Sequence, residues 1–90
     1  MNSRPAFEAI KNALSSDPLT RIVSADFSQE HFGNFVIAFS KEGVESSLVL
    51  DRGELAICQG LNGSDDCRTL LSTIYDVNEQ ELIAAVKASG

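Results

Sequence analysis

The chain has 90 residues, a length that excludes two domains, a large cofactor cleft and a parallel barrel. Its composition is 43% hydrophobic and 22% charged, which excludes disorder and is typical of a soluble globular domain. Thirteen acidic and seven basic residues give a net charge of −6. Nucleic acids and anionic membranes attract basic surfaces, so neither is an expected partner, whereas an acidic surface suits a basic protein.

The first residues contain no apolar signal region and no small-residue cleavage site, so we expect no secretory leader. The longest apolar runs have five residues, as at residues 35–39, and are far shorter than the roughly 20 residues that a membrane span needs. Two cysteines are too few for a disulfide framework. These features predict a cytoplasmic protein whose thiols are reduced.

The N-terminal segment has the pattern of an amphipathic helix. Pro5 is favourable in a first turn, where its missing N–H costs nothing. Phe7, Ile10 and Leu14 then follow at helical spacing and form one apolar stripe. Residues 15–18 end in proline, and the residue before a proline avoids the helical region, so the helix should end there.

From Leu19 onward apolar residues recur with a period of two, which predicts four short strands joined by turns. Short connections favour an antiparallel meander. In the first strand, Val23, Ala25 and Phe27 are predicted to share one face. The predicted core residues of the strands are Phe27, Phe35, Ile37, Phe39, Leu48, Leu50, Leu55 and Ile57.

A two-residue hairpin loop at residues 52–53 fixes the register of the strands around it. This loop pairs Leu50 with Leu55 and Leu48 with Ile57, so large apolar residues meet on one face. For the preceding hairpin, a turn over Lys41, Glu42 and Gly43 predicts that Phe35 pairs with Leu48 and Ile37 with Ser46.

Two further helices are expected after a loop at residues 59–63. Ser64 is a suitable N-cap for the first of them, whose apolar stripe would comprise Leu70, Leu71, Ile74 and Tyr75. Asn78 with Glu81 predicts a capping box for a last helix that buries Leu82, Ile83 and Val86. The expected fold is therefore one α+β domain over residues 1–90, with a four-stranded antiparallel meander, an N-terminal helix and two C-terminal helices on one face.

Catalytic chemistry would depend on few residues. His31, the single histidine, lies in the connection between the first two strands, and no nucleophile-elbow motif accompanies it. Cys67 is placed in the first turn of a predicted helix, which lowers a thiol pKa, but Asp65 and Asp66 oppose that effect. Cys58 and Cys67 form no C-x-x-C pair. We predict no metal, no cofactor and no catalytic site, with the cysteines as small packing residues.

The second face of the predicted sheet is the candidate binding surface. It combines small residues with an acidic margin and a charged hairpin tip, a pattern typical of a protein interface when no helix covers it. The predicted partner-binding residues are Asp26, Val36, Ala38, Glu45, Ser47, Val49, Asp51, Arg52, Glu54 and Ala56.

The segments Gly33–Val36, Gly43–Val44 and Leu48–Glu54 together resemble a pattern in small bacterial proteins, some of them immunity proteins of polymorphic toxin systems. The resemblance implies a module that blocks a toxin by surface contact, without catalysis. The leading hypothesis is a non-catalytic protein-binding module with a basic partner, either monomeric or a homodimer. The alternatives are a small enzyme or thiol-dependent domain that uses Cys67 or His31, and a homo-oligomer that pairs its sheet faces.

Overall fold

The computed structural model describes residues 1–31, 33–59 and 66–89. It has an α+β fold in which an N-terminal helix, a five-stranded antiparallel sheet and a C-terminal helix follow in chain order. The expected fold class and meander are confirmed, but the expected four strands and three helices are not. The elements are α1 (Ser3–Ser15), β1 (Thr20–Ser28), the 3-10 turn η1 (Gln29–His31), β2 (Asn34–Lys41), β3 (Val44–Asp51), β4 (Glu54–Gln59), β5 (Asp66–Leu71) and α2 (Glu79–Ser89).

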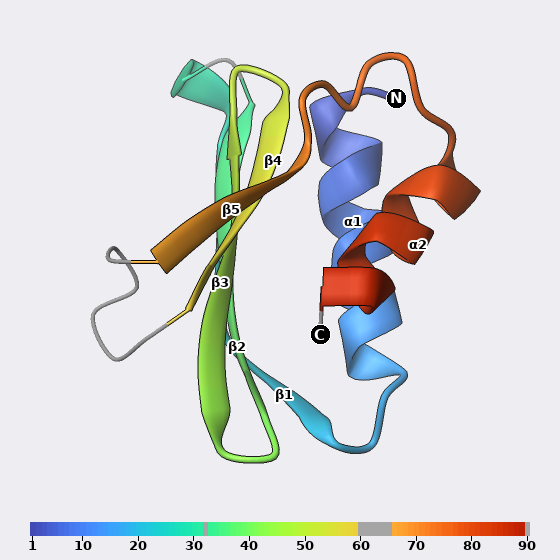
Figure 1. Cartoon of the computed structure of the whole chain (residues 1–90). Coiled ribbons are helices and arrows are strands. Elements are labelled where there is room, and N and C mark those ends of the chain that lie inside the picture. Colours follow the sequence, from blue (N-terminus) through green and yellow to red (C-terminus); the bar gives the residue numbers. More distant parts are fainter. Residues whose placement is uncertain (32, 60–65, 90) are drawn as a thin grey trace.

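The molecule has two layers. Figure 1 shows both helices on the same side of the sheet. Helix α1 packs against β1 and β2, while α2 packs against α1 and β5. In the described part of the chain, no helix covers the other face of the sheet. Below, the face under the helices is called the inner face and the opposite one the outer face.

Helix α1 begins and ends where the sequence predicts. Pro5 lies in its first turn, and its buried stripe packs on the sheet. At its end the Ser16 hydroxyl donates to the Ala13 carbonyl. The Asp17 carboxylate then accepts the Leu19 N–H, which turns the chain into β1. The buried residues of α1 are Ala6, Phe7, Ala9, Ile10 and Leu14.

The hairpin between β3 and β4 has the predicted register. Leu50 pairs with Leu55 and Leu48 with Ile57. Its two-residue loop, residues 52–53, has positive φ at both positions, as the favoured hairpin turns require.

The hairpin between β2 and β3 departs from the predicted register by two residues. Phe35 pairs with Leu50 and Ile37 with Leu48, because the loop consists of residues 42–43 alone and Lys41 already pairs with Val44. Both loop residues have positive φ, so this turn is as tight as the next one. A shift of two preserves the faces of a strand, and the core assignments therefore hold.

Strand β1 contains a β-bulge between Ile22 and Ser24. The bulge turns Val23 outward, where 60% of its surface is exposed, and Ile22 packs against the core in its place. The prediction that Val23 shares a face with Phe27 is therefore wrong, because strict alternation fails at a bulge.

The segment expected to form the second helix instead contains β5, which pairs with β4. A second bulge between the partners of Leu55 and Ala56 leaves Leu70 without an opposite residue. Leu70 and Leu71 both pack against the core. Two consecutive apolar residues on one face imitate a helical stripe, which explains the wrong helix. The predicted N-cap, Ser64, lies outside the described residues.

The last helix is confirmed, including its cap. The Asn78 side-chain oxygen accepts the Glu81 N–H at 2.9 Å. Before it, Ile74 is fully buried and donates its N–H to the Gly53 carbonyl, which attaches this connection to the β3–β4 turn. Tyr75, expected in an apolar stripe, is 53% exposed.

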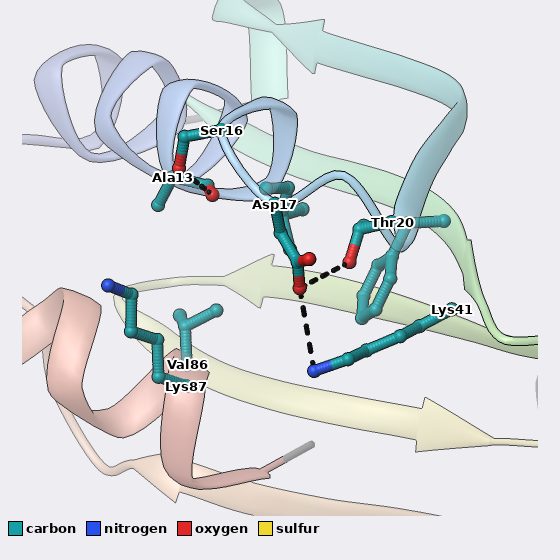
Figure 2. A pocket seen from close by; sticks show the side chains of 9 residues that line it. Ala13, Ser16, Asp17, Thr20, Lys41, Val86 and Lys87 are labelled. Carbon is teal, nitrogen blue, oxygen red and sulfur yellow. Dashed lines mark hydrogen bonds and ion pairs between the residues drawn. The ribbon is translucent and has the colours of Figure 1, made fainter.

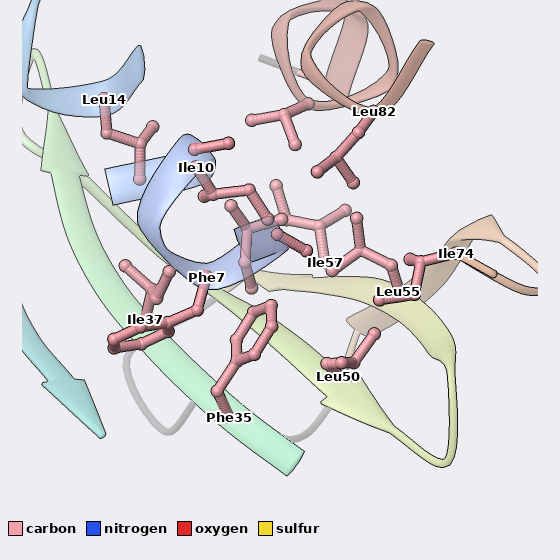
Figure 3. Packing of buried hydrophobic residues seen from close by; sticks show 14 of the residues in the cluster. Phe7, Ile10, Leu14, Phe35, Ile37, Leu50, Leu55, Ile57, Ile74 and Leu82 are labelled. Carbon is pink, nitrogen blue, oxygen red and sulfur yellow. The ribbon is translucent and has the colours of Figure 1, made fainter. Parts of the chain in front are cut away.

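The core lies between the sheet and the two helices, with α1 at its centre (Figure 3). Phe35 and Phe39 share the inner face, as predicted. The Phe7 ring packs 5.2 Å from the Phe35 ring and 5.3 Å from the Phe27 ring. Phe27 is only half-buried because it lies on the edge strand. The fully buried large side chains are Ile10, Ile37, Leu48, Leu50, Leu55, Ile74 and Leu82.

Candidate functional site

The outer face is built by two rows of side chains that cross all five strands. The residues of each row are opposed in adjacent strands, so they lie side by side on one surface. Most are small, which makes this surface flat. The first row is Asp26, Val36, Val49, Ala56 and Thr69, and the second is Ser24, Ala38, Ser47, Cys58 and Cys67.

The rows include apolar surface that the fold leaves accessible. Val36 is 39% exposed although it lies on the second strand of the sheet. Ala38, Val49 and Ala56 are half-buried by their cross-strand neighbours. An accessible apolar centre on a flat sheet is a feature of protein-binding surfaces.

Acidic residues lie at the ends and side of this surface. Asp26 is opposite Val36 at the β1 side, and Glu45 is opposite Ser40 near the β2–β3 turn. Asp51 and Glu54 are directly opposed at the β3–β4 turn. All four carboxylate residues are exposed, so the margin has the negative charge that the sequence predicts.

Asn34 orders the charged hairpin tip. Its amide nitrogen donates to an Asp51 carboxylate oxygen at 3.2 Å, and its amide oxygen accepts the Arg52 N–H at 2.9 Å. The tip is thus held against β2 by side-chain contacts. Sequence reasoning did not assign Asn34 to the site. It also did not place Thr69 and Cys67 on the outer face, because the strand that contains them was expected to be a helix.

The two cysteines form a disulfide between β4 and β5. Cys58 and Cys67 are directly opposed in the sheet, with a Cα–Cα distance of 4.0 Å. The expectation of reduced thiols is therefore wrong, and so is the placement of Cys67 at a helix N-terminus. Prediction of a strand at residues 66–71, paired with β4, would have placed the two cysteines opposite each other. The cytoplasmic location stays a prediction that the disulfide weakens, because such bonds persist mainly in oxidising compartments.

The structure does not describe the side chain of His31, the other catalytic candidate. His31 ends the 3-10 turn η1, and its side chain lies outside the described part of the structure. The loop at residues 60–65 also lies outside it. Among the described residues, no group of three or more His, Cys, Asp and Glu could hold a metal ion.

A cleft that the sequence did not predict opens where both helices end. It has a volume of about 380 Å³, with Leu14, Phe39 and Val86 among its apolar lining residues. Figure 2 shows Asp17 and Lys41 at its side.

Asp17 is a charged group of this cleft that is held by several contacts. Its carboxylate accepts the Thr20 hydroxyl at 3.0 Å and lies 3.5 Å from the Lys41 ammonium. The hydrogen bond from the Leu19 N–H, then that from Thr20, and finally the charge of Lys41 hold the pKa of Asp17 below its usual value. These bonds use the carboxylate to fasten the α1–β1 turn, so the group has a structural role.

No family model, no curated protein and no solved structure matches this chain. Within its described residues, no helix is long and apolar enough to cross a membrane.

Proposed function

We propose that this chain is a non-catalytic protein-binding module whose outer sheet face binds a cationic protein. The observation that supports the proposal is the outer face, which neither helix of the described part of the chain covers. Its accessible apolar centre includes Val36, Val49 and Ala56. Burial of that centre would contribute to binding through the hydrophobic effect.

The charges around this centre favour a basic partner. Asp26, Glu45, Asp51 and Glu54 are exposed on it or at its margin, and the whole chain has a net charge of −6. A cationic surface would gain from these carboxylates at the rim, where charges steer association and add specificity. A toxin neutralised by surface contact fits this description, so the immunity-like role suggested by the hairpin pattern is part of the proposal.

The thiol-dependent alternative loses the features on which it was based. Cys67 lies in a strand and shares a disulfide with Cys58, so an activated thiolate would first require reduction of that bond.

Homo-oligomerisation through the outer face predicts the opposite salt dependence. Two outer faces packed on each other would bring acidic margins together, and like charges oppose such pairing. Added salt would therefore strengthen a face-to-face dimer, whereas it would weaken binding of a cationic protein.

The test uses the partner that cross-links to this chain in its native cells, produced separately and titrated by calorimetry. We expect Val36→Lys and Val49→Lys each to weaken binding more than about tenfold, because a cation enters the apolar centre and faces a cationic partner. We also expect affinity to fall between about 50 and 500 mM salt.

The control is Gln80→Lys, which adds the same charge to an exposed position on α2, across the molecule from the outer face. It should bind like the unmodified chain. Unchanged affinity in both valine variants, with their melting temperatures intact, would place the binding site elsewhere. Affinity that rises with salt would contradict a cationic partner.

A further inference from the structure

We propose that β1 pairs with β1 of a second copy, so that two sheets join edge to edge into one ten-stranded sheet. Strand β1 is the first strand in the sheet order, and within the described residues only β2 pairs with it. It has nine residues, three more than β5 at the opposite edge. An open edge strand presents backbone N–H and C=O groups that can template pairing.

Hydrogen bonds at the two ends of β1 indicate which of its backbone groups face this open edge. The first bond lies at the start of the strand. The Leu19 carbonyl accepts the Glu42 N–H at 3.4 Å, so Leu19 faces β2. Since backbone groups alternate in direction along an antiparallel strand, Thr20 and Ile22 face the open edge. The Thr20 N–H is already bonded to the Asp17 carbonyl, so Ile22 is the main pairing residue in this half.

The other half of β1 is oriented by its far end. The Ser28 carbonyl accepts the Gly33 N–H at 3.0 Å and therefore faces the β2 side. Counting back by alternation, Phe27 and Ala25 face the open edge.

One antiparallel register of the two β1 strands pairs the edge-facing residues of both halves of the strand. If Ile22 pairs with Ala25 of the second copy, Thr20 pairs with Phe27, and every residue in these pairs faces the shared edge. Ile22, Ala25 and Phe27 all pack against their own core, so the helix layers of the two copies lie on the same side. The β1 bulge makes this match available, because without it residues 22 and 25 would lie on opposite faces.

The charges of β1 agree with the same register. Arg21 falls opposite Asp26 of the second copy, and the two-fold symmetry forms this ion pair twice. Both residues are exposed in the single chain. Val23, 60% exposed, lies beside the two-fold axis, where the second copy would cover it. Charged residues and bulges on an edge strand often prevent it from pairing with another sheet. In β1, however, the charges and the bulge match those of a second copy.

The interface is small, so we expect a weak dimer at the low end of specific association. Sedimentation velocity from about 10 µM to about 1 mM should show a dimer that grows with concentration. Added salt screens both the Arg21–Asp26 pairs and the repulsion between two chains of net charge −6, so variants of these two residues, and not salt, separate edge pairing from face-to-face pairing. This comparison does not depend on the proposed function of the outer face.

The decisive variants are Arg21→Asp and Asp26→Arg. Each places like charges opposite one another twice and should raise the dimer dissociation constant about tenfold. The double variant reverses both members of the pair and should restore dimerisation. Arg68→Asp makes the same charge change at the exposed β5 edge and is the matched control, with no expected effect.

Hydrogen exchange gives a second readout. The amides of Ile22, Ala25 and Phe27 should become more protected as concentration rises, while those of β5 should not. If either single variant fails to fold, Arg21→Gln and Asp26→Asn provide the same comparison with a smaller effect. A chain that stays monomeric at about 1 mM, or a dimer that both single variants leave unchanged, would overturn the proposal.

Discussion

Two turn glycines share a backbone conformation but differ in their surroundings. Gly43 and Gly53 have φ values of 83° and 85°. A Cβ on Gly43 would have no atom within 4 Å, whereas one on Gly53 would lie 2.5 Å from Cε2 of Tyr75. Both turns therefore favour glycine by conformation, and Gly53 is also required by packing.

We expect Gly43→Ala to lower the free energy of unfolding by about 1–2 kcal/mol, the cost of the left-handed conformation. Gly53→Ala should cost about 1 kcal/mol more, because the Tyr75 ring must move. Urea denaturation measures both values. Adding Tyr75→Ala to each variant is the control: it should remove the difference between the two, and a difference that persists would contradict the packing explanation.

The carboxylate of Asp17 predicts a pH dependence of stability. Hydrogen bonds from Leu19 and Thr20, with the nearby charge of Lys41, lower its pKa in the folded chain. Its ionised form therefore stabilises the fold above the unfolded-state pKa, about 3.9, and this contribution disappears as pH falls through the lower folded-state pKa.

Asp17→Asn should consequently lower the melting temperature near pH 7 and have a smaller effect near pH 2. Melting curves of both proteins across this range measure the difference. The exposed Asp76→Asn serves as the control for a general loss of negative charge. A gap between Asp17→Asn and the unmodified chain that is the same at both pH values would show that ionisation of Asp17 contributes nothing.

At the scale of elements, the disulfide decides how firmly β5 is attached. It closes a short loop, since Cys58 and Cys67 are nine positions apart. The chain-entropy relation gives about 2–3 kcal/mol of stabilisation for a loop of this size. Replacing both cysteines by alanine should reduce the free energy of unfolding by that amount and leave the fold intact.

Hydrogen exchange should localise the effect of this change. The amides of β5 should lose protection, while the central strands β2 and β3 keep theirs. Reduction of the unmodified chain with a dithiol should reproduce the same loss, and the alanine variant should not respond to the reductant. Equal stability of the oxidised and reduced chains would contradict this account.

At the scale of the whole molecule, the N-terminal ammonium of Met1 joins the start of the chain to the connection between β5 and α2. It donates to the carbonyls of Ile74, Tyr75 and Val77 at 2.8, 2.9 and 3.2 Å. These carbonyls lie in the connection from β5 to α2. The contact thus links the start of α1 to the segment that carries the last helix.

Acetylation of this ammonium, or a peptide tag fused before Met1, removes its charge and part of its donor capacity. We expect a loss of about 1–3 kcal/mol in the free energy of unfolding, the range for hydrogen bonds to charged groups. Chemical denaturation of the free and acetylated chains measures it. A tag of equal length after the last residue is the control, and equal losses from both tags would contradict the specific role of the ammonium.

Local signals explain why much of the fold could be predicted. Residues 52–53 fixed the β3–β4 register, since a two-residue turn leaves one pairing and the apolar pattern agreed with it. Asn78 marked the start of α2 because its cap bond spans only three residues. The alternation of residues along each strand, joined by short turns, likewise predicted that most of the outer-face residues, including Val36, Val49 and Ala56, share one surface.

What sequence reasoning predicted wrongly or missed depends on contacts that lie outside the segment itself. Strand β5 forms by pairing with β4. The bulge at Leu70 places two consecutive apolar residues on one face, and in the sequence alone this pattern is the same as that of a helical stripe. The Cys58–Cys67 bond and the contacts of Met1 likewise require the assembled sheet and helices. Hydrophobic periodicity reports which residues are buried, but only tertiary pairing decides whether a short apolar segment is buried as a strand or as a helix.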